Sequence, residues 1–256
     1  MSLRVLVCVK RVPAPGAEIV LTDDRKRLDT EFLGFTTSPH EECAVEEAVR
    51  IKESSGGTVT VLTLGPEEAE EQLRYAVSVG ADQAVLIVNQ GDDLDPQATS
   101  SAVAAAIRSL EEAEGPFNLI LFGNESADSG GYQVGVRVAF ALGRPMVNGI
   151  KGIEVEQGSI TARRATDAGF EVYRLPMPAV LGVKEGINLP RYPTLTGRLA
   201  SKKVVIERRE LTPERGGLEL VELSRPVQQK VDTVMLGRGA DAAPRVVDTL
   251  VELGVL

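Results

Sequence analysis

The feature that most constrains the fold of this chain is a regular alternation of two kinds of segment between Leu3 and Gly143. Short, nearly continuous apolar runs rich in β-branched residues are typical of strands that are buried on both faces. Such runs occupy residues 3–9, 58–64, 83–88 and 118–122, and each is followed by an amphipathic helical pattern, over 41–53, 66–79, 98–113 and 131–142. Strand-then-helix units in series predict a parallel sheet with helices on both faces, which is a doubly wound α/β fold.

The pattern changes after Gly143. Residues 150–156 and 159–164 flank the tight-turn pair Gln157-Gly158, which predicts an antiparallel hairpin, and residues 170–174 and 178–183 are expected to continue it. Residues 184–201 hold two prolines and two glycines without a period, which indicates a long loop that is either functional or a mobile connector. Residues 206–256 form a polar tail with a last short helix at 244–253, and they have too few apolar positions for a domain of their own.

Composition argues against several classes of function. A net charge of -9 disfavours binding to nucleic acid or to an anionic membrane, and the two basic stretches, 198–203 and 207–209, are short enough for a solvated strand edge. The two cysteines, Cys8 and Cys43, lack metal-site or disulfide spacing, so we expect a reducing, cytoplasmic setting. A hydrolase with a catalytic imidazole would depend on the single histidine, His40, and no GxSxG motif accompanies it. We expect no secretory signal, and we expect no membrane-spanning segment because the sequence has no apolar run of about 18 residues.

The most informative motif is the stretch Gly123–Gly135, which reads GNESADSGGYQVG. It follows a predicted buried strand and opens a predicted helix, so its backbone N–H groups and hydroxyls are suited to hold a phosphate at a helix N-terminus. It carries no P-loop lysine, which indicates holding a phosphate rather than cleaving one. A glycine-rich turn in which Asp128 or Ser129 caps the helix is the simpler alternative.

Two further segments follow strands and precede helices. Ser38 and Glu41 have the spacing of a capping box, which is compatible with a ligand contact and does not require one. Leu64-Gly65-Pro66 ends the second strand, where the backbone can approach a planar ring closely. Since ligands of doubly wound folds bind outside the carboxyl ends of the strands, the three segments together predict a crevice for a mononucleotide.

Several ordered motifs resemble the beta subunit of electron transfer flavoproteins. They are VLVCVKRV, AVEEAVRIKE, VLTLGP, YAVSVGAD, the glycine-rich stretch, ARRATDAGFEVYRLPMPAVLGV and NLPRYPTL, and they run from about Leu3 to Val205. The most specific of them, residues 162–182, follows the family signature at Arg164, Asp167, Gly169, Glu171, Pro178, Val180 and Leu181 and departs from it at Ala168, Tyr173 and Gly182.

The resemblance implies an electron carrier that is not an enzyme, in which an alpha subunit holds most of a redox-active FAD and the beta subunit holds a structural AMP. Its donors would be flavoprotein dehydrogenases, such as the acyl-CoA dehydrogenases of fatty acid oxidation, and its acceptor a quinone-linked or other protein. The resemblance assigns the nucleotide contacts to Cys8, Ser38, Pro39, His40, Glu41, Leu64, Gly123, Asn124, Glu125, Ser126, Ala127, Asp128, Ser129, Gly130, Gly131, Tyr132, Gln133 and Val134.

Recognition of the dehydrogenase is assigned to Leu195, with Tyr192 and Arg191 beside it, and the basic stretch 198–203 would help to orient the complex. The resemblance thus divides the chain into a nucleotide-binding domain, 1–205, that includes the recognition loop 184–201, and an arm, 206–256, that packs on a partner subunit. In some family members aromatic side chains lie near the flavin where this chain has Pro13, Pro15 and His40, so His40 is either a flavin neighbour or a residue of the helix cap.

Three alternatives stay open. In bifurcating members of the family a second FAD takes the place of AMP, although the GNESADSGGYQVG stretch favours AMP. An adenine-nucleotide hydrolase of the related α/β superfamily would need an SGGxDS motif near the first strand, where this chain has Arg11-Val-Pro-Ala-Pro-Gly. A purely structural nucleotide-sensing partner would do no redox work.

Overall fold

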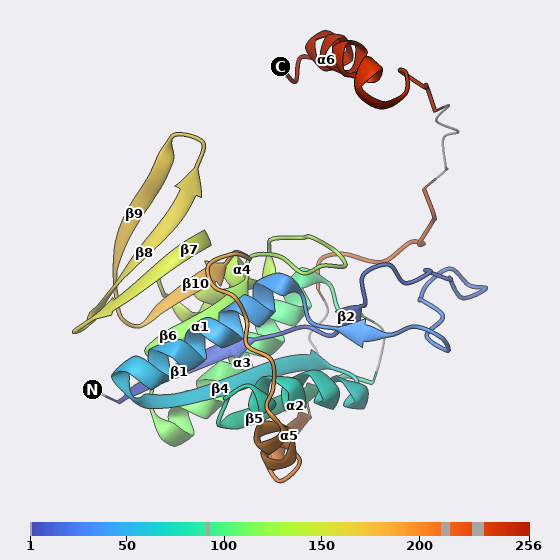
Figure 1. Cartoon of the computed structure of the whole chain (residues 1–256). Helices are drawn as coiled ribbons and strands as arrows, with labels where there is room; N and C mark the ends of the chain where they lie inside the picture. Colours follow the sequence, from blue (N-terminus) through green and yellow to red (C-terminus); the bar gives the residue numbers. More distant parts are fainter. Residues whose placement is uncertain (1, 91–92, 211–215, 227–232) are drawn as a thin grey trace. The chain divides into compact units, whose positions relative to one another are not determined.

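The computed structural model describes residues 2–90, 93–210, 216–226 and 233–256. The chain divides into two compact units, one that ends at Glu222 and one that runs from Leu223 to Leu256 (Figure 1). In the described chain, the first unit contains the sheet, five α-helices and the 3-10 helix η1, and the second contains the 3-10 helix η2 and one α-helix, α6. Parts of the predicted arm, residues 211–215 and 227–232, lie outside the described residues.

The first unit is built on a nine-stranded sheet in the order β11-β5-β4-β1-β6-β10-β7-β8-β9. Neighbours from β11 to β7 run parallel, whereas β7, β8 and β9 form an antiparallel extension, so the predicted mostly parallel sheet with a hairpin extension is confirmed. The strands are β1 (Leu3–Cys8), β4 (Gly57–Gly65), β5 (Gln83–Val88), β6 (Leu119–Gly123), β7 (Met146–Glu156), β8 (Ser159–Thr166), β9 (Gly169–Pro176), β10 (Ala179–Val183) and β11 (Ile206–Glu210).

Helices cover both faces of the parallel part of this sheet, as the strand-then-helix alternation predicts (Figure 1). Alternate residues of β1 point to opposite faces: Val5 and Val7 join a core cluster with α1 and α2, and Leu6 and Cys8 join a second cluster with α3 and α4. The helices are α1 (Pro39–Ser55), the 3-10 turn η1 (Glu67–Ala69), α2 (Glu70–Ser78), α3 (Pro96–Glu114), α4 (Val134–Leu142) and α5 (Leu195–Ser201). Apolar burial on both faces explains why the inner strands are almost continuously apolar.

Two shorter features complete the description. A two-stranded antiparallel ribbon of β2 (Val12–Pro13) and β3 (Phe35–Thr36) brings together the two ends of the segment between them. The guanidinium of Arg11 stacks on the ring of Phe35.

The second unit contains η2 (Gly239–Ala242) and α6 (Ala243–Glu252), and neither helix has a buried residue. None of the described helices is long and apolar enough to cross a membrane.

The prediction that residues 178–183 continue the antiparallel hairpin is wrong. β10 instead lies between β6 and β7 and pairs parallel with both. All five of its residues are buried, which is the pattern of a central strand covered on both faces rather than of a hairpin arm. Gly182 makes the close approach to β7 feasible, because a Cβ at this position would lie 2.1 Å from Asn148 Oδ1.

The region after β10 also differs from the prediction. The expected long loop 184–201 ends in helix α5, where the Thr194 hydroxyl accepts a hydrogen bond from the Gly197 N–H (3.0 Å). The basic stretch 198–203 therefore lies on and just after a helix, not on a strand edge, whereas residues 207–209 do belong to the edge strand β11. Because β11 pairs with β5, the sheet extends past the boundary expected at residue 205.

Candidate nucleotide site at the carboxyl ends of β1 and β6

The site is positioned by a reversal in the strand order. From β1 the chain moves outward through β4 and β5, and it then returns to the other side of β1 to form β6. Ligands of doubly wound sheets bind outside the carboxyl ends of the strands at such a point, because the loops diverge there and leave a crevice. In this chain the point lies between Cys8, at the end of β1, and Gly123, at the end of β6.

The first turn of α1 forms one wall of the site. The Ser38 hydroxyl accepts a hydrogen bond from the Glu41 N–H (3.2 Å), and the Glu41 carboxylate accepts one from the Ser38 N–H (3.0 Å), which confirms the predicted capping box. Pro39 occupies the first turn, where the absence of its N–H costs nothing. Burial raises the pKa of Glu41 to about 7, although hydrogen bonds from Ser38 and from the Lys10 backbone oppose the shift.

Gly123 brings the end of β6 against this turn. A Cβ at residue 123 would lie 2.7 Å from Glu41 Cγ and 3.2 Å from His40 Cβ. Such distances are too short for any larger side chain, so glycine is required by the close approach of strand and helix. The structure thus brings together two sequence-predicted segments, 38–41 and the start of the glycine-rich stretch.

The rim loop, residues 124–133, is held over this turn by two side-chain contacts, an ion pair of Lys10 and a contact of His40 with a carboxylate. Lys10 Nζ lies 2.5 Å from an Asp128 carboxylate oxygen, and His40 Nε2 lies 3.3 Å from a Glu125 carboxylate oxygen. His40 Nδ1 accepts a hydrogen bond from the Glu185 N–H (2.8 Å), so a neutral His40 carries its proton on Nε2. Lys10 and Glu185 were not predicted from the sequence; the position of Lys10 just beyond β1 was the available signal, and for Glu185 there was none.

The backbone of the rim loop contains two residues in a left-handed conformation. Gly130 and Tyr132 both have a φ of +54°, a left-handed conformation that turns successive N–H groups to one side. In the described part of the chain, the N–H groups of Gly131, Gln133 and Tyr132 donate to no protein acceptor. They directly precede α4, whose N-terminus adds partial positive charge, so a phosphate would find unpaired donors here.

The other members of the rim loop are arranged around these donors. The hydroxyls of Ser126 and Ser129 lie 2.9 Å apart, and the Asn124 N–H donates to the Val183 carbonyl (2.8 Å), which ties the loop to β10. Ala127 lies between Ser126 and Asp128 in the same turn. A hydrogen bond with Glu125 raises the pKa of the exposed Tyr132 hydroxyl.

The expectation that Asp128 or Ser129 caps the following helix is wrong. α4 begins at Val134, and its N-cap residue, Gln133, makes no side-chain capping bond. Asp128 lies too far ahead of the helix and pairs with Lys10 instead. Partial burial would raise the pKa of Asp128, but the charge of Lys10 and hydrogen bonds from Lys10, Ser126 and Ser129 together outweigh it and hold the pKa below its usual range.

The remaining nucleotide candidates lie below the rim in the core. Cys8 is buried, and burial raises the pKa of its thiol. Leu64 on β4 and Val134 at the start of α4 pack against the core cluster that contains Cys8, on the α3 and α4 face of the sheet. Cys8 and Cys43 are both free thiols. Among the described residues no group of three or more His, Cys, Asp or Glu side chains is placed to hold a metal ion.

The residues assigned to partner recognition are Arg191 and Tyr192, just before α5, and Leu195, its first residue. The side chains of Tyr192 and Leu195 are exposed, with 90% and 76% of their surface accessible. Arg191 differs, because its guanidinium contacts Glu46 and Glu53 of α1 in the same chain. Its expected contact with a partner stays a prediction.

Fold and site together define a doubly wound α/β protein with a glycine-rich loop at the point where its strand order reverses. The comparison with protein families is specific: residues 30–214 match the model of the electron transfer flavoprotein domain. The chain is 39% identical to the electron transfer flavoprotein subunit beta of Mycobacterium tuberculosis strain H37Rv over 205 residues, which cover 78% of this chain and 76% of the relative.

Two other relatives extend the likeness to nearly the whole chain. The electron transfer flavoprotein subunit beta of Bacillus subtilis is 32% identical over 255 residues, with 97% of both chains covered. The mitochondrial subunit beta of Oryza sativa is 32% identical over 240 residues, covering 91% of this chain and 93% of the relative. The chain therefore belongs to the electron transfer flavoprotein family, among its beta subunits.

Proposed function

We propose that this chain is the beta half of a heterodimeric electron carrier and that it holds an adenylate, AMP, in the crevice between β1 and β6. The observation that carries the proposal is the set of N–H groups at residues 131–133 that donate to no acceptor among the described residues, at the point where the strand order reverses. The names of its relatives, which describe an electron transfer flavoprotein subunit beta, support the carrier role.

Each part of an adenylate has a suitable group in the site. The N–H groups of the rim loop and the N-terminus of α4 would hold the phosphate, with Lys10 as the nearby cation. Lys10 now pairs with Asp128, and a bound phosphate would compete for the same ammonium group. The first turn of α1, from Ser38 to Glu41, and the end of β4 at Leu64 would enclose the rest of the nucleotide.

The redox chemistry would come from an FAD held mainly by an alpha subunit, which supplies reversible electron uptake when bound. This chain would contribute to the flavin environment, with His40 as its candidate, and would present Leu195 and Tyr192 to a flavoprotein dehydrogenase such as an acyl-CoA dehydrogenase. A quinone-linked or other acceptor would then receive the electrons. A reducing, cytoplasmic compartment and a role in fatty acid oxidation belong to the same proposal.

The first experiment is co-expression with an alpha partner, extraction of the nucleotides from the purified complex, and mass spectrometry. We expect a yellow complex that releases FAD and AMP, whereas this chain alone should be colourless. Release of FAD at twice the amount of complex, with no AMP, would instead assign a second flavin to the crevice. A complex with an empty crevice would refute the adenylate.

A variant pair tests the place of the nucleotide. Gly123→Ala puts a methyl group 2.7 Å from Glu41 Cγ, so the α1 turn must shift away from β6, and AMP content should fall while FAD content is kept. Gly34→Ala is the matched control, since its new methyl group would lie 3.8 Å from the nearest atom, Ala14 Cβ. Full AMP content in the Gly123→Ala complex would place the nucleotide elsewhere.

A further inference from the structure

The segment that precedes α5 lies along helix α1 over most of its length. We call residues 184–195 the docking segment, because it ends in the exposed residue proposed to contact the dehydrogenase. His40 accepts a hydrogen bond from the Glu185 N–H (2.8 Å), and the Asn188 amide donates to the Cys43 carbonyl (3.0 Å) and to Glu47 Oε2 (2.9 Å). Residues 40, 43 and 47 share one face of a helix, so α1 supports the segment turn by turn.

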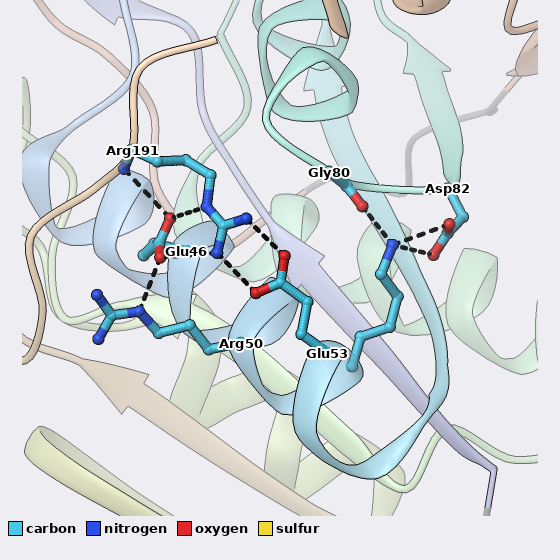
Figure 2. A network of polar contacts seen from close by, with 7 residues as sticks. Glu46, Arg50, Glu53, Gly80, Asp82 and Arg191 are labelled. Carbon is cyan, nitrogen blue, oxygen red and sulfur yellow. Dashed lines mark hydrogen bonds and ion pairs between the residues drawn. The ribbon is translucent and has the colours of Figure 1, made fainter. Parts of the chain in front are cut away.

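The strongest contacts lie at Arg191. Its Nε and Nη2 bond both oxygens of Glu46 (2.8 and 3.1 Å), and its Nη1 and Nη2 bond both oxygens of Glu53 (2.6 and 2.9 Å). Figure 2 shows the guanidinium between the two carboxylates, with Arg50 on the far side of Glu46, where its Nε lies 2.7 Å from Oε1. The Arg191 backbone N–H also donates to Glu46 (3.2 Å), so main chain and side chain are fixed together.

Burial makes this arrangement costly to break. The Glu46 side chain is only 4% exposed, and a buried carboxylate that stays charged is costly unless it is paired with a cation and hydrogen-bonded. Burial alone would raise the pKa of Glu46, but the hydrogen bonds from Arg191 and Arg50 outweigh it and hold the pKa below its ordinary value. Displacing Arg191 would leave most of that carboxylate unpaired, so the segment keeps its place at this residue.

The exposed residues beyond Arg191 have little to hold them. Tyr192 and Leu195 have 90% and 76% of their surface accessible, so apolar packing within this chain does not fix their positions. After Leu195 the chain continues as α5, which packs tightly on α2, because a Cβ at Gly197 would lie 2.2 Å from the Ser78 carbonyl oxygen. Residues 192–195 are thus a short span between two fixed points, the Arg191 contact on α1 and the Gly197 contact on α2.

We propose that Arg191 and Glu46 are positioning residues that hold the docking segment in its binding conformation before a dehydrogenase arrives. This inference rests on the proposed function for the role of Leu195, and it assigns Arg191 to its own chain rather than to the partner surface. A segment fixed in advance loses less conformational entropy on binding, which strengthens a complex that buries few apolar side chains.

The test uses the purified alpha/beta complex and two measurements. Amide hydrogen exchange over residues 188–195 reports the order of the segment without any dehydrogenase, and steady-state reduction by a dehydrogenase reports docking. We expect Arg191→Gln and Glu46→Gln each to speed the exchange about tenfold. We expect both to raise KM for the complex about fivefold while kcat stays unchanged.

Control variants separate positioning from direct contact. Arg50→Gln removes a cation from Glu46 without touching the docking segment, so exchange and KM should stay at wild-type values. Leu195→Ala should raise KM and leave exchange unchanged, because its side chain is exposed. If Arg191 acted on the partner directly, Arg191→Gln would raise KM while Glu46→Gln would not, and that result would overturn the inference.

The remaining outcomes are also decisive. Unchanged exchange in both Arg191→Gln and Glu46→Gln refutes positioning, whatever the KM values are. Should a variant fold poorly, the double variant Arg191→Leu with Glu46→Leu removes both charges, leaves no buried carboxylate unpaired, and should still show fast exchange. A third outcome is that no dehydrogenase reduces the wild-type complex, while the docking segment still loses order in the variants. This would contradict the proposed function, but it would not contradict the role of Arg191 and Glu46 in ordering the segment.

Discussion

At the scale of single residues, Glu41 combines two properties that rarely occur together. Its carboxylate is required by the capping box of α1, and it is buried at the candidate nucleotide site. Burial raises its pKa from 4.5 to about 7, so close to neutral pH the folded protein holds a proton that the unfolded chain releases. This gives the first turn of α1 a dependence on pH that the capping pattern alone does not suggest.

The sign of the effect follows from proton binding. Between about pH 4.5 and pH 7 the folded state binds more protons at Glu41 than the unfolded state, so the free energy of unfolding should fall as the pH rises through this range. The Glu41 contribution is on the order of a few kcal/mol, as expected for a shift of this size. Glu41→Gln keeps an acceptor for the Ser38 N–H and cannot ionise, so it should lose less stability between pH 5 and pH 8.

Denaturant titrations of wild type and Glu41→Gln across that range measure the difference. Other groups titrate in both proteins and cancel in the comparison. Parallel curves for the two proteins would show that Glu41 has an ordinary pKa. A wild type that gains stability relative to Glu41→Gln as the pH rises would mean that its charged form is the favoured one.

At the scale of elements, helix caps differ in how firmly the sequence predicts them. Asp95 caps α3: its Oδ1 accepts a hydrogen bond from the Ala98 N–H (2.7 Å), and its Oδ2 accepts one from the Leu218 N–H (2.8 Å). Asp128, which looked like a cap of α4, lies ahead of the helix and pairs with Lys10 at a partly exposed position. The two aspartates therefore stabilise the fold in different ways.

Alanine substitutions distinguish them. Asp95→Ala should lower the free energy of unfolding by about 1 kcal/mol or more, because it removes a cap and the bond to residue 218. Asp128→Ala removes a partly exposed ion pair with Lys10 and a hydrogen bond from the neighbouring Ser129 N–H but no helix cap, so it should cost less than about 1 kcal/mol. Asp95→Asn, which keeps an acceptor for the cap, is the matched control. Equal losses in Asp95→Ala and Asp128→Ala would show that Asp128 does support α4.

How well each element could be predicted depends on how far apart along the chain the interacting residues are. Strands β1, β4, β5 and β6 and helices α1 to α3 were predicted within a few residues, because periodicity and caps are local signals. The place of β10 was not predicted, since an apolar run does not say whether the chain pairs with the preceding hairpin or returns to the sheet centre. Burial of all five residues of β10 appears only in the folded chain.

The same distinction holds in the candidate site. The capping box of Ser38 and Glu41 spans three residues and was visible in the sequence. The contact of Lys10 with Asp128 joins residues 118 positions apart, and that of Arg191 with Glu46 joins residues 145 apart. No local pattern encodes such pairs, so neither contact was predicted from the sequence.

At the scale of the whole molecule, the chain has one unit with a core and one without. The unit that ends at Glu222 contains the two core clusters, and its last residues are tied back by Lys26 Nζ, which donates to the Leu220 carbonyl (2.7 Å). Leu223–Leu256 contains α6, whose residues Val246, Val247 and Val251 are exposed. An exposed apolar helix face is typical of a surface that is covered in a complex.

Truncation after Glu222 tests this division. We expect the shortened chain to keep the thermal unfolding midpoint of the full chain measured without a partner, because none of the residues of α6 is buried in the described chain. It should bind an alpha subunit more weakly, which co-purification and analytical ultracentrifugation would show. The pair Val247→Ser and Val251→Ser in the full chain should weaken binding in the same direction without shortening the chain. The opposite outcome is a truncated chain that unfolds at a lower temperature and still binds the alpha subunit fully. Only packing of the tail within this chain would explain that combination, so the tail would then belong to the fold rather than to an interface.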